Sequence, residues 1–161
     1  MKIPTKEECL KILNNNKTPS NVIRHSKAVC KVAEKIADNI IKKGIKVNKK
    51  LVIAAALLHD IERGKDQHVM RGFRLLKKLG YPEVAKVMKK HSLYKLEVKS
   101  NQPSTWEEKI VFYADKRCKD DKIVSLKQRF NALEDYYKVN LSKELNFTKN
   151  IEKELLGENI L

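Results

Sequence analysis

The amino-acid sequence predicts an all-α fold, a compact bundle of about seven or eight helices. Apolar residues recur at helical spacing through most of the 161 residues, and turn-forming residues are scarce, with only 5 Gly and 4 Pro. The breaks between the apolar stretches also carry residues that favour helix ends, such as Ser, Thr, Asn or Asp before a stretch and Gly after it. We therefore expect a few long helices rather than many short strands.

Each predicted helix begins at a residue that can cap or open a helix and ends at a helix-breaking residue or a polar run. The predicted helical segments are 5–16, 20–44, 48–64, 66–80, 82–91, 104–119, 125–137 and 142–157, and residues 93–103 are predicted to form a loop. Asp66 is the expected cap of the fourth segment. Two starts have capping-box spacing, Ser104 with Glu107 and Ser125 with Gln128.

Two of these helices carry informative apolar patterns. The third is apolar on nearly all sides up to the pair His59-Asp60, so we expect it to run through the core. The seventh places one apolar stripe against the core, formed by Leu126, Phe130, Leu133 and Tyr137.

The charge balance is strongly basic, with 35 Lys and Arg against 20 Asp and Glu and a formal net charge of +15. Clustered basic residues are typical of nucleic-acid binding, because they release counterions from the phosphate backbone. Here the basic residues are mostly Lys and are spread over nearly every helical segment. We favour a solvated surface over a nucleic-acid site, and a positive field that helps to capture small anions such as nucleotides.

The cysteines and the N-terminus bear on the compartment. Cys9, Cys30 and Cys118 are odd in number and far apart, which suggests neither a disulfide framework nor a thiolate zinc site. The N-terminal segment lacks the features of a signal peptide, and no apolar run approaches the ~20 residues of a membrane helix. We expect a cytoplasmic protein that does not associate with a membrane.

The pair His59-Asp60 stands at the end of a strongly apolar helix, where charged groups are costly to bury unless they are paired or bound to a metal. Taken alone, the pair is weak evidence for a metal site, because a His and an Asp at a fraying helix end can simply be solvated. The other three histidines and one aspartate change this interpretation, because they follow a recognisable order along the chain.

In that order the chain resembles the HD-domain metal-dependent phosphohydrolases, whose pattern is H…HD…H…H…D on successive helices. The matching stretches are VIRHSKAV around His25, ALLHDIERG around His59 and Asp60, QHVMRGFRLLKKLGYPEVAKVMKKHS with His68 and His91, and EEKIVFYADKR with Asp115. The resemblance covers about residues 20–118. It implies one HD domain over residues 1–161, with the C-terminal helices of residues 125–157 packed on the core.

The resemblance also implies a set of metal ligands. In the family, the first His, the HD pair and the last Asp hold one metal, which corresponds here to His25, His59, Asp60 and Asp115. Members with two further histidines bind a second metal that shares the Asp of the HD pair, which implies His68 and His91 with Asp60 bridging. The alternative is that His68 and His91 are ordinary polar residues at helix ends, as the helix dipole would favour for His91.

The expected cofactor is therefore a divalent metal, two ions in the binuclear form. Nitrogen and oxygen ligands without sulfur suit Mn, Fe, Co, Ni or Zn, with Mg as a further candidate. Two such ions can lower the pKa of a shared water and steady the oxygens at phosphorus, so hydrolysis of a phosphomonoester or anhydride follows. The expected partner is a small phosphorylated substrate, such as a nucleotide, and the sequence does not indicate an oligomeric state.

The expected catalytic residues are Asp60, as the shared ligand, and Arg63, which lies three residues further on the same predicted helix face and can bind the substrate phosphate. Weaker candidates for phosphate contacts are Arg24, Lys65, Arg71 and Lys116.

Differences from two known subfamilies disfavour guanosine tetraphosphate and deoxynucleoside monophosphates as substrates. Guanosine tetraphosphate hydrolases carry an acidic pair where this chain has Gly64-Lys65, and deoxynucleoside monophosphatases carry a catalytic Glu where Arg63 stands. The bacterial diadenosine tetraphosphate hydrolases share the binuclear ligand pattern, so we expect a nucleotide or a related phosphomonoester or anhydride as the substrate.

Two other functions stay open at this point. The same ligand pattern holds a di-iron centre in myo-inositol oxygenase and its small relatives. A non-catalytic module that binds nucleic acid or another anion is the second alternative, but such a module would not need the complete ligand set.

Overall fold

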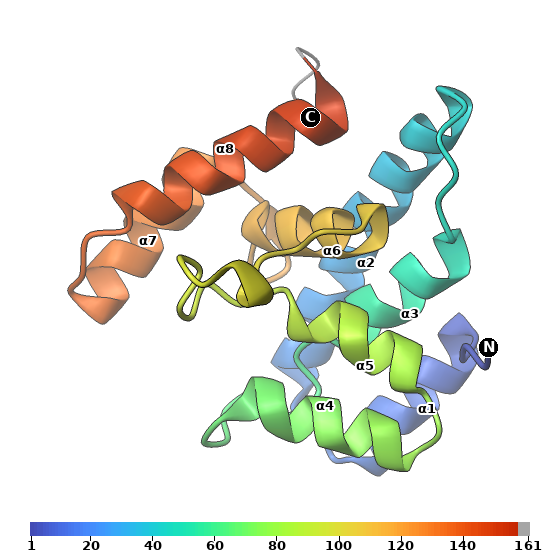
Figure 1. The fold of residues 1–161 in the computed structure, drawn as a ribbon. Coiled ribbons are helices and arrows are strands. Elements are labelled where there is room, and N and C mark those ends of the chain that lie inside the picture. Colours follow the sequence, from blue (N-terminus) through green and yellow to red (C-terminus); the bar gives the residue numbers. More distant parts are fainter. Residues whose placement is uncertain (158–161) are drawn as a thin grey trace.

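A computed structural model describes residues 1–157, which form eight α-helices, one short 3-10 helix and one two-stranded hairpin (Figure 1). The predicted all-α class is confirmed. The predicted domain extends to Leu161, and residues 158–161 lie outside the described part of the chain. None of the helices within residues 1–157 is long and apolar enough to cross a membrane.

The helices follow the order of the predicted segments. They are α1 (Lys6–Asn15), α2 (Ser20–Lys42), α3 (Lys49–Leu58), α4 (His68–Lys78), α5 (Pro82–Lys89), α6 (Trp106–Lys116), α7 (Leu126–Tyr137) and α8 (Ser142–Leu156). The 3-10 helix η1 (Lys99–Asn101) lies in the predicted loop. The antiparallel hairpin of β1 (Cys118–Lys119) and β2 (Lys122–Ile123) was not predicted.

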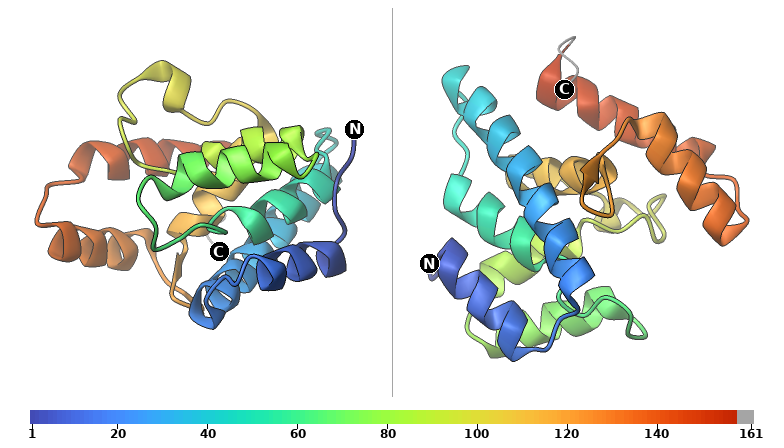
Figure 2. Two further views of the ribbon diagram at one scale, coloured as in Figure 1. Left: turned by 90° about the horizontal axis from the view of Figure 1, so that it is seen from below. Right: turned by 180° about the vertical axis from the view of Figure 1, so that it is seen from behind.

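Helix α2 is the centre of the bundle and packs against both α3 and α6. Helix α5 packs on α3 and α4, and α1 also packs on α3 (Figure 2). Helices α7 and α8 run side by side at one end of the molecule, with α8 against α6 (Figure 1). The three consecutive alanines Ala54, Ala55 and Ala56 of α3 are fully buried, which confirms that this helix runs through the core. Their small side chains allow the neighbouring helices to approach closely.

Helix α3 ends earlier than predicted, at Leu58, and residues 59–64 form turns instead of two further helical turns. The carbonyl of Ile61 accepts hydrogen bonds from Thr18 Oγ1 and Asn16 Nδ2, both at 3.1 Å, and these bonds tie the segment to the start of α2. Gly64 has a φ of +92°, a conformation that suits glycine. The prediction that Asp60 and Arg63 share a helix face was therefore wrong in detail. A turn with a 2.8 Å bond from Arg63 N to the Asp60 carbonyl still keeps them together.

The capping boxes were predicted with partial success. Helix α7 begins as expected, with Ser125 as its N-cap and Gln128 completing the box. Helix α6 begins one residue later than predicted, because Thr105 is the N-cap and Glu108 completes the box. Glu107 instead accepts a 2.7 Å hydrogen bond from the backbone N–H of Asn48 and so links the starts of α6 and α3.

The three cysteines are buried and free, and burial raises the pKa of each thiol to about 12. Because the thiolate is the reactive form, we expect Cys9, Cys30 and Cys118 to react slowly with a disulfide reagent at pH 8 in the folded protein. Unfolding in guanidinium should release all three thiols. A titration with Ellman's reagent with and without denaturant measures both states, and a fast-reacting thiol in the folded protein would contradict this expectation.

Candidate metal centre

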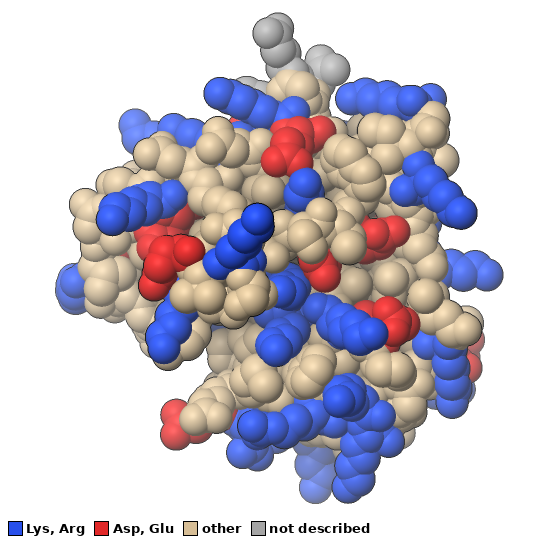
Figure 3. All heavy atoms as spheres, viewed as in Figure 1, with Lys and Arg blue, Asp and Glu red and all other residues tan. Residues whose placement is uncertain are grey.

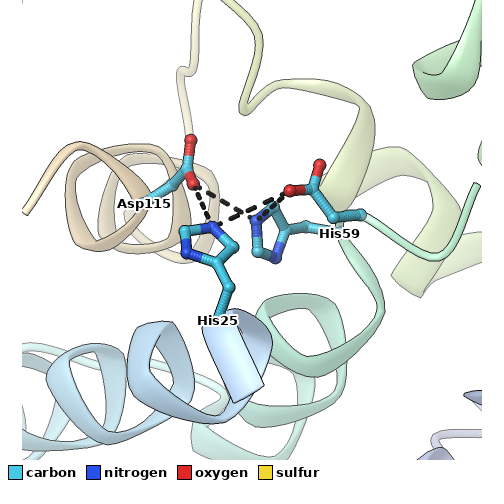
Figure 4. Close-up of side chains that lie close together, drawn as sticks. His25, His59 and Asp115 are labelled. Carbon is cyan, nitrogen blue, oxygen red and sulfur yellow. Dashed lines mark hydrogen bonds and ion pairs between the residues drawn. The ribbon is translucent and has the colours of Figure 1, made fainter. Parts of the chain in front are cut away.

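The predicted ligands come from separate helices and meet at one place in the bundle. His25 lies on α2, Asp115 on α6 and His68 at the start of α4, whereas His59, Asp60 and His91 follow directly after the ends of α3 and α5. Figure 4 shows the side chains of His25, His59 and Asp115 pointing toward one another. The site therefore forms where helix ends converge on the central helix α2.

The first group of potential ligands is His25, His59, Asp60 and Asp115, whose ligand atoms all lie within 4.8 Å of one another. Asp115 Oδ1 is 3.0 Å from His25 Nε2 and 3.2 Å from His59 Nε2. Asp60 Oδ2 is 3.7 Å from His25 Nε2 and 3.4 Å from His59 Nε2. Two carboxylates and two imidazoles thus face a common centre.

The outer nitrogens of three histidines fix which nitrogen faces this centre. His25 Nδ1 lies 2.6 Å from the carbonyl of Asp120, His59 Nδ1 2.7 Å from that of Ala56, and His91 Nδ1 2.6 Å from that of Met88. A carbonyl only accepts, so each Nδ1 donates, and in the neutral imidazole the lone pair is then on Nε2. These lone pairs face carboxylate oxygens, an arrangement that needs a proton or a cation between them.

The unpredicted β1–β2 hairpin orients one of the histidines of the first group. Asp120 lies at its turn with a φ of +54° and supplies the carbonyl that orients His25.

The second group is Asp60, His68 and His91. Asp60 Oδ1 is 3.4 Å from His91 Nε2 and 3.8 Å from His68 Nε2. This oxygen is buried and has no hydrogen-bond partner within the described residues. Such a buried, unpartnered carboxylate oxygen is costly unless a cation binds it. Asp60 therefore presents one oxygen to each group, as a bridging ligand would.

His68 is the most exposed of the six side chains, at 29% of its side-chain surface. The structure starts α4 at His68 itself, and its N-cap is Gln67 in a left-handed conformation with a φ of +50°. The predicted cap Asp66 was therefore wrong by one residue.

The electrostatics of the site favour a cation. Burial would lower the pKa of His59, but Asp60 and Asp115 outweigh it and raise that pKa to about 10. Burial would raise the pKa of Asp60, but His59 and His91 hold it well below its usual range. Asp115 behaves alike, because Lys116 and the two histidines lower its pKa against burial. Both carboxylates are ionised, and His59 takes up a proton in the absence of a metal.

Lys116 forms hydrogen bonds to one residue of each group. Its ammonium is buried and donates to Asp115 Oδ2 at 2.6 Å and to the carbonyl of His91 at 2.7 Å. One lysine thus holds a carboxylate of the first group and the backbone of a histidine of the second group.

A cavity of about 280 Å³ opens beside His25 and Asp60, and its basic wall residues are Arg63, Lys119 and Arg129. A second cavity of about 730 Å³ opens on the side of His68 and is bordered by Lys89, Lys90 and Lys95. Lys and Arg side chains also cover much of the visible surface, with acidic residues between them (Figure 3). The site is therefore reached through two basic openings.

The structure separates the five predicted phosphate contacts. Arg63 lines the first cavity and places Nη1 3.9 Å from Asp60 Oδ1. Lys116 is enclosed by its partners, and Lys65 pairs with Glu62 at 2.5 Å. Arg24 and Arg71 are exposed, and neither lines one of the two cavities described above.

The sequence did not indicate that Lys119, Arg129 and the tyrosine pair of α7 line the site. Tyr137 was predicted on the apolar stripe of α7, yet it is 53% exposed and lines the first cavity with Tyr136. Leu126 and Phe130 of that stripe are buried as predicted.

Comparison with known proteins identifies the family of the chain. The HD domain family matches residues 22–120 of the chain. A tRNA (cytidine(56)-2'-O)-methyltransferase of Picrophilus torridus is 35% identical over an alignment of 147 residues, and the match covers 83% of this chain and 42% of that protein. An uncharacterized protein of Methanocaldococcus jannaschii is 36% identical over an alignment of 123 residues, and the match covers 68% of this chain and 72% of that protein. No solved structure matches the chain significantly. The chain belongs to the HD domain family.

Proposed function

We propose that this protein is a metal-dependent phosphohydrolase that acts on a nucleotide or a related phosphomonoester or anhydride. One divalent ion would be held by His25, His59, Asp60 and Asp115, and a second by Asp60, His68 and His91. The observation that carries the proposal is the buried carboxylate of Asp60, whose oxygens each face a different set of histidines. When bound, a pair of divalent ions lowers the pKa of a bound water and stabilises charge at phosphorus.

The residues around the metal centre bind and orient the substrate in this proposal. Arg63 is 43% exposed in the cavity wall, and Asp60 lies near its guanidinium without a close hydrogen bond. Its donors are therefore available to a phosphate that reaches the cavity. The carbonyl bonds to three Nδ1 atoms keep the histidine rings in place, so the ligands need little reorganisation.

The name of the Picrophilus relative describes another reaction, but the chain spans only 42% of that protein's length. We assign the phosphohydrolase function to the shared region, because the HD match covers most of what the two chains have in common. Methyl transfer would then belong to the remainder of the relative.

Hydrolysis assays that measure both released phosphate and nucleotide products test the proposal. The purified protein is loaded in turn with Mn, Co, Ni, Fe or Mg and given a panel of nucleotides, sugar phosphates and dinucleoside polyphosphates. We expect metal-dependent hydrolysis of at least one class. Oxygen consumption by the iron form without phosphate release would instead support the oxygenase alternative. No hydrolysis product from any compound with the fully loaded protein would contradict the proposal.

Replacing Arg63 by alanine tests its role in substrate binding. We expect unchanged metal content and a decrease in kcat/KM on the order of ten- to a hundredfold, as for the loss of a charge-assisted hydrogen bond. Arg74→Ala is the matched control, because Arg74 is exposed on α4 and lines neither cavity. Normal kinetics of Arg63→Ala with full metal loading would exclude Arg63.

A further inference from the structure

One face of α7 forms the outer wall of the cavity beside the metal centre. Its cavity-lining residues are Arg129, Ala132, Leu133, Tyr136 and Tyr137. These positions follow the helical spacing i, i+3, i+4, i+7 and i+8, so they form a continuous stripe along α7. The stripe changes in character along its length, from a cation through two apolar residues to a pair of aromatic rings.

The cation at the inner end has no anionic partner among the residues that the structure describes. The Nε of Arg129 is buried and makes no hydrogen bond, and no carboxylate within residues 1–157 pairs with its guanidinium. A partly buried guanidinium without an anion is unfavourable, and a bound phosphate would supply the missing acceptor. His25 and Asp60 line the same cavity, so this phosphate would lie beside the metal centre.

The aromatic end is exposed. Tyr136 and Tyr137 are 80% and 53% exposed, and their rings lie 4.9 Å apart and almost perpendicular to each other. Large exposed apolar rings at the mouth of a cavity are typical of a surface that receives a flat ligand by stacking. Arg129 and Tyr136 are seven positions apart on the helix, roughly 10 Å at the rise of an α-helix, which is about the length of a nucleotide from phosphate to base.

We propose that this face of α7 recognises the nucleotide. Arg129 binds a phosphate group next to the metal centre, Ala132 and Leu133 lie under the sugar, and the base stacks on Tyr136 and Tyr137. The inference rests on the proposed function in that it takes the metal centre as the place of the reacting phosphate. It adds the residues that distinguish a nucleotide from a phosphate ester without a base.

Equilibrium binding tests the inference without requiring turnover. The probes are the α,β-methylene diphosphates of adenosine, guanosine, cytidine and uridine, together with methylenediphosphonate, which lacks the nucleoside. Each is titrated calorimetrically into the Mn-loaded protein. We expect at least one nucleoside probe to bind about tenfold or more tightly than methylenediphosphonate, as base stacking on an aromatic side chain supplies.

Variants separate the two ends of the stripe. The nucleoside margin is the factor by which a nucleoside probe binds more tightly than methylenediphosphonate. The double variant Tyr136→Ala/Tyr137→Ala should lose this margin and leave the Kd of methylenediphosphonate unchanged. The double variant with phenylalanine should keep the margin. Arg129→Met should weaken all probes by a similar factor. Tyr94→Ala is the matched control, because Tyr94 is an exposed tyrosine that borders the other cavity.

Three outcomes would overturn the inference: no margin in the wild type, a margin that survives the double alanine variant, or a margin that disappears in Tyr94→Ala. The proposed function is decided separately. Tyrosine-dependent binding without hydrolysis of any phosphate would remove the proposed function and keep the inference. Hydrolysis of phosphate esters without a nucleoside margin would do the reverse.

Discussion

Replacing Asp60 by alanine is expected to remove all bound metal from the protein, whereas replacing His68 or His91 is expected to remove only one of two ions. The reason is the position of Asp60, whose Oδ2 faces His25 and His59 and whose Oδ1 faces His68 and His91. A bridging carboxylate serves both ions, so its loss weakens both sites together. Hydrolysis should fall to background in Asp60→Ala because the paired ions are lost.

Metal-to-protein ratios after loading and dialysis measure this effect, by mass spectrometry of the metal on wild type and each variant. Asp66→Ala is the control, since Asp66 is an exposed aspartate near the site and belongs to neither group. An Asp60→Ala protein that retains a full equivalent of metal would refute the bridging role. A wild type that holds a single ion at saturation, with His68→Ala fully active, would leave only the mononuclear form.

The helices could be predicted because the signals that define them are local. The capping box of Ser125 and Gln128 involves residues three apart, and its hydrogen bonds form within the helix it opens. The early end of α3 could not be predicted in this way. It depends on hydrogen bonds from Asn16 and Thr18 to the Ile61 carbonyl, which join segments more than forty positions apart.

The candidate ligands could be named from the sequence because the HD pattern fixes residue types in a set order. That the six side chains converge is a property of the folded bundle. The residues of α7 that line the cavity followed no such pattern in the sequence. Arg129 is one of many basic residues in the sequence, and only packing shows that, within residues 1–157, its guanidinium lacks an anion beside the cavity. Tyr137 fitted an apolar stripe whose first members, Leu126 and Phe130, are buried, but at the last turn of α7 the stripe faces the cavity and Tyr137 is 53% exposed.

The buried ammonium of Lys116 was predicted as a weak phosphate contact, and its surroundings suggest a different role. It lies between Asp115 and the backbone of His91 and 4.9 Å from the centre of the Phe112 ring. Burial lowers the pKa of Lys116 despite the nearby carboxylate of Asp115. With both of its acceptors inside the protein, this side chain is a positioning residue for ligands of both groups.

Lys116→Met keeps an unbranched apolar stem as far as the ε position but removes the ammonium and its donors. We expect the metal-free protein to lose about 3 kcal/mol in free energy of unfolding, the usual cost of breaking a buried ion pair from one side. Asp115 Oδ2 and the His91 carbonyl would both be left without that donor. Urea unfolding followed by circular dichroism measures the loss, and Lys127→Met, an exposed position on α7, should leave stability nearly unchanged.

Metal affinity distinguishes positioning from stability alone. Because Lys116 holds Asp115 of the first group and His91 of the second, Lys116→Met should weaken the binding of both ions, measured by Mn titration at a temperature where the variant is folded. A variant that loses stability but binds both ions with wild-type affinity would make Lys116 a structural residue only. A variant as stable as the wild type would show that the apolar stem replaces the ion pair without cost, as happens for some buried pairs.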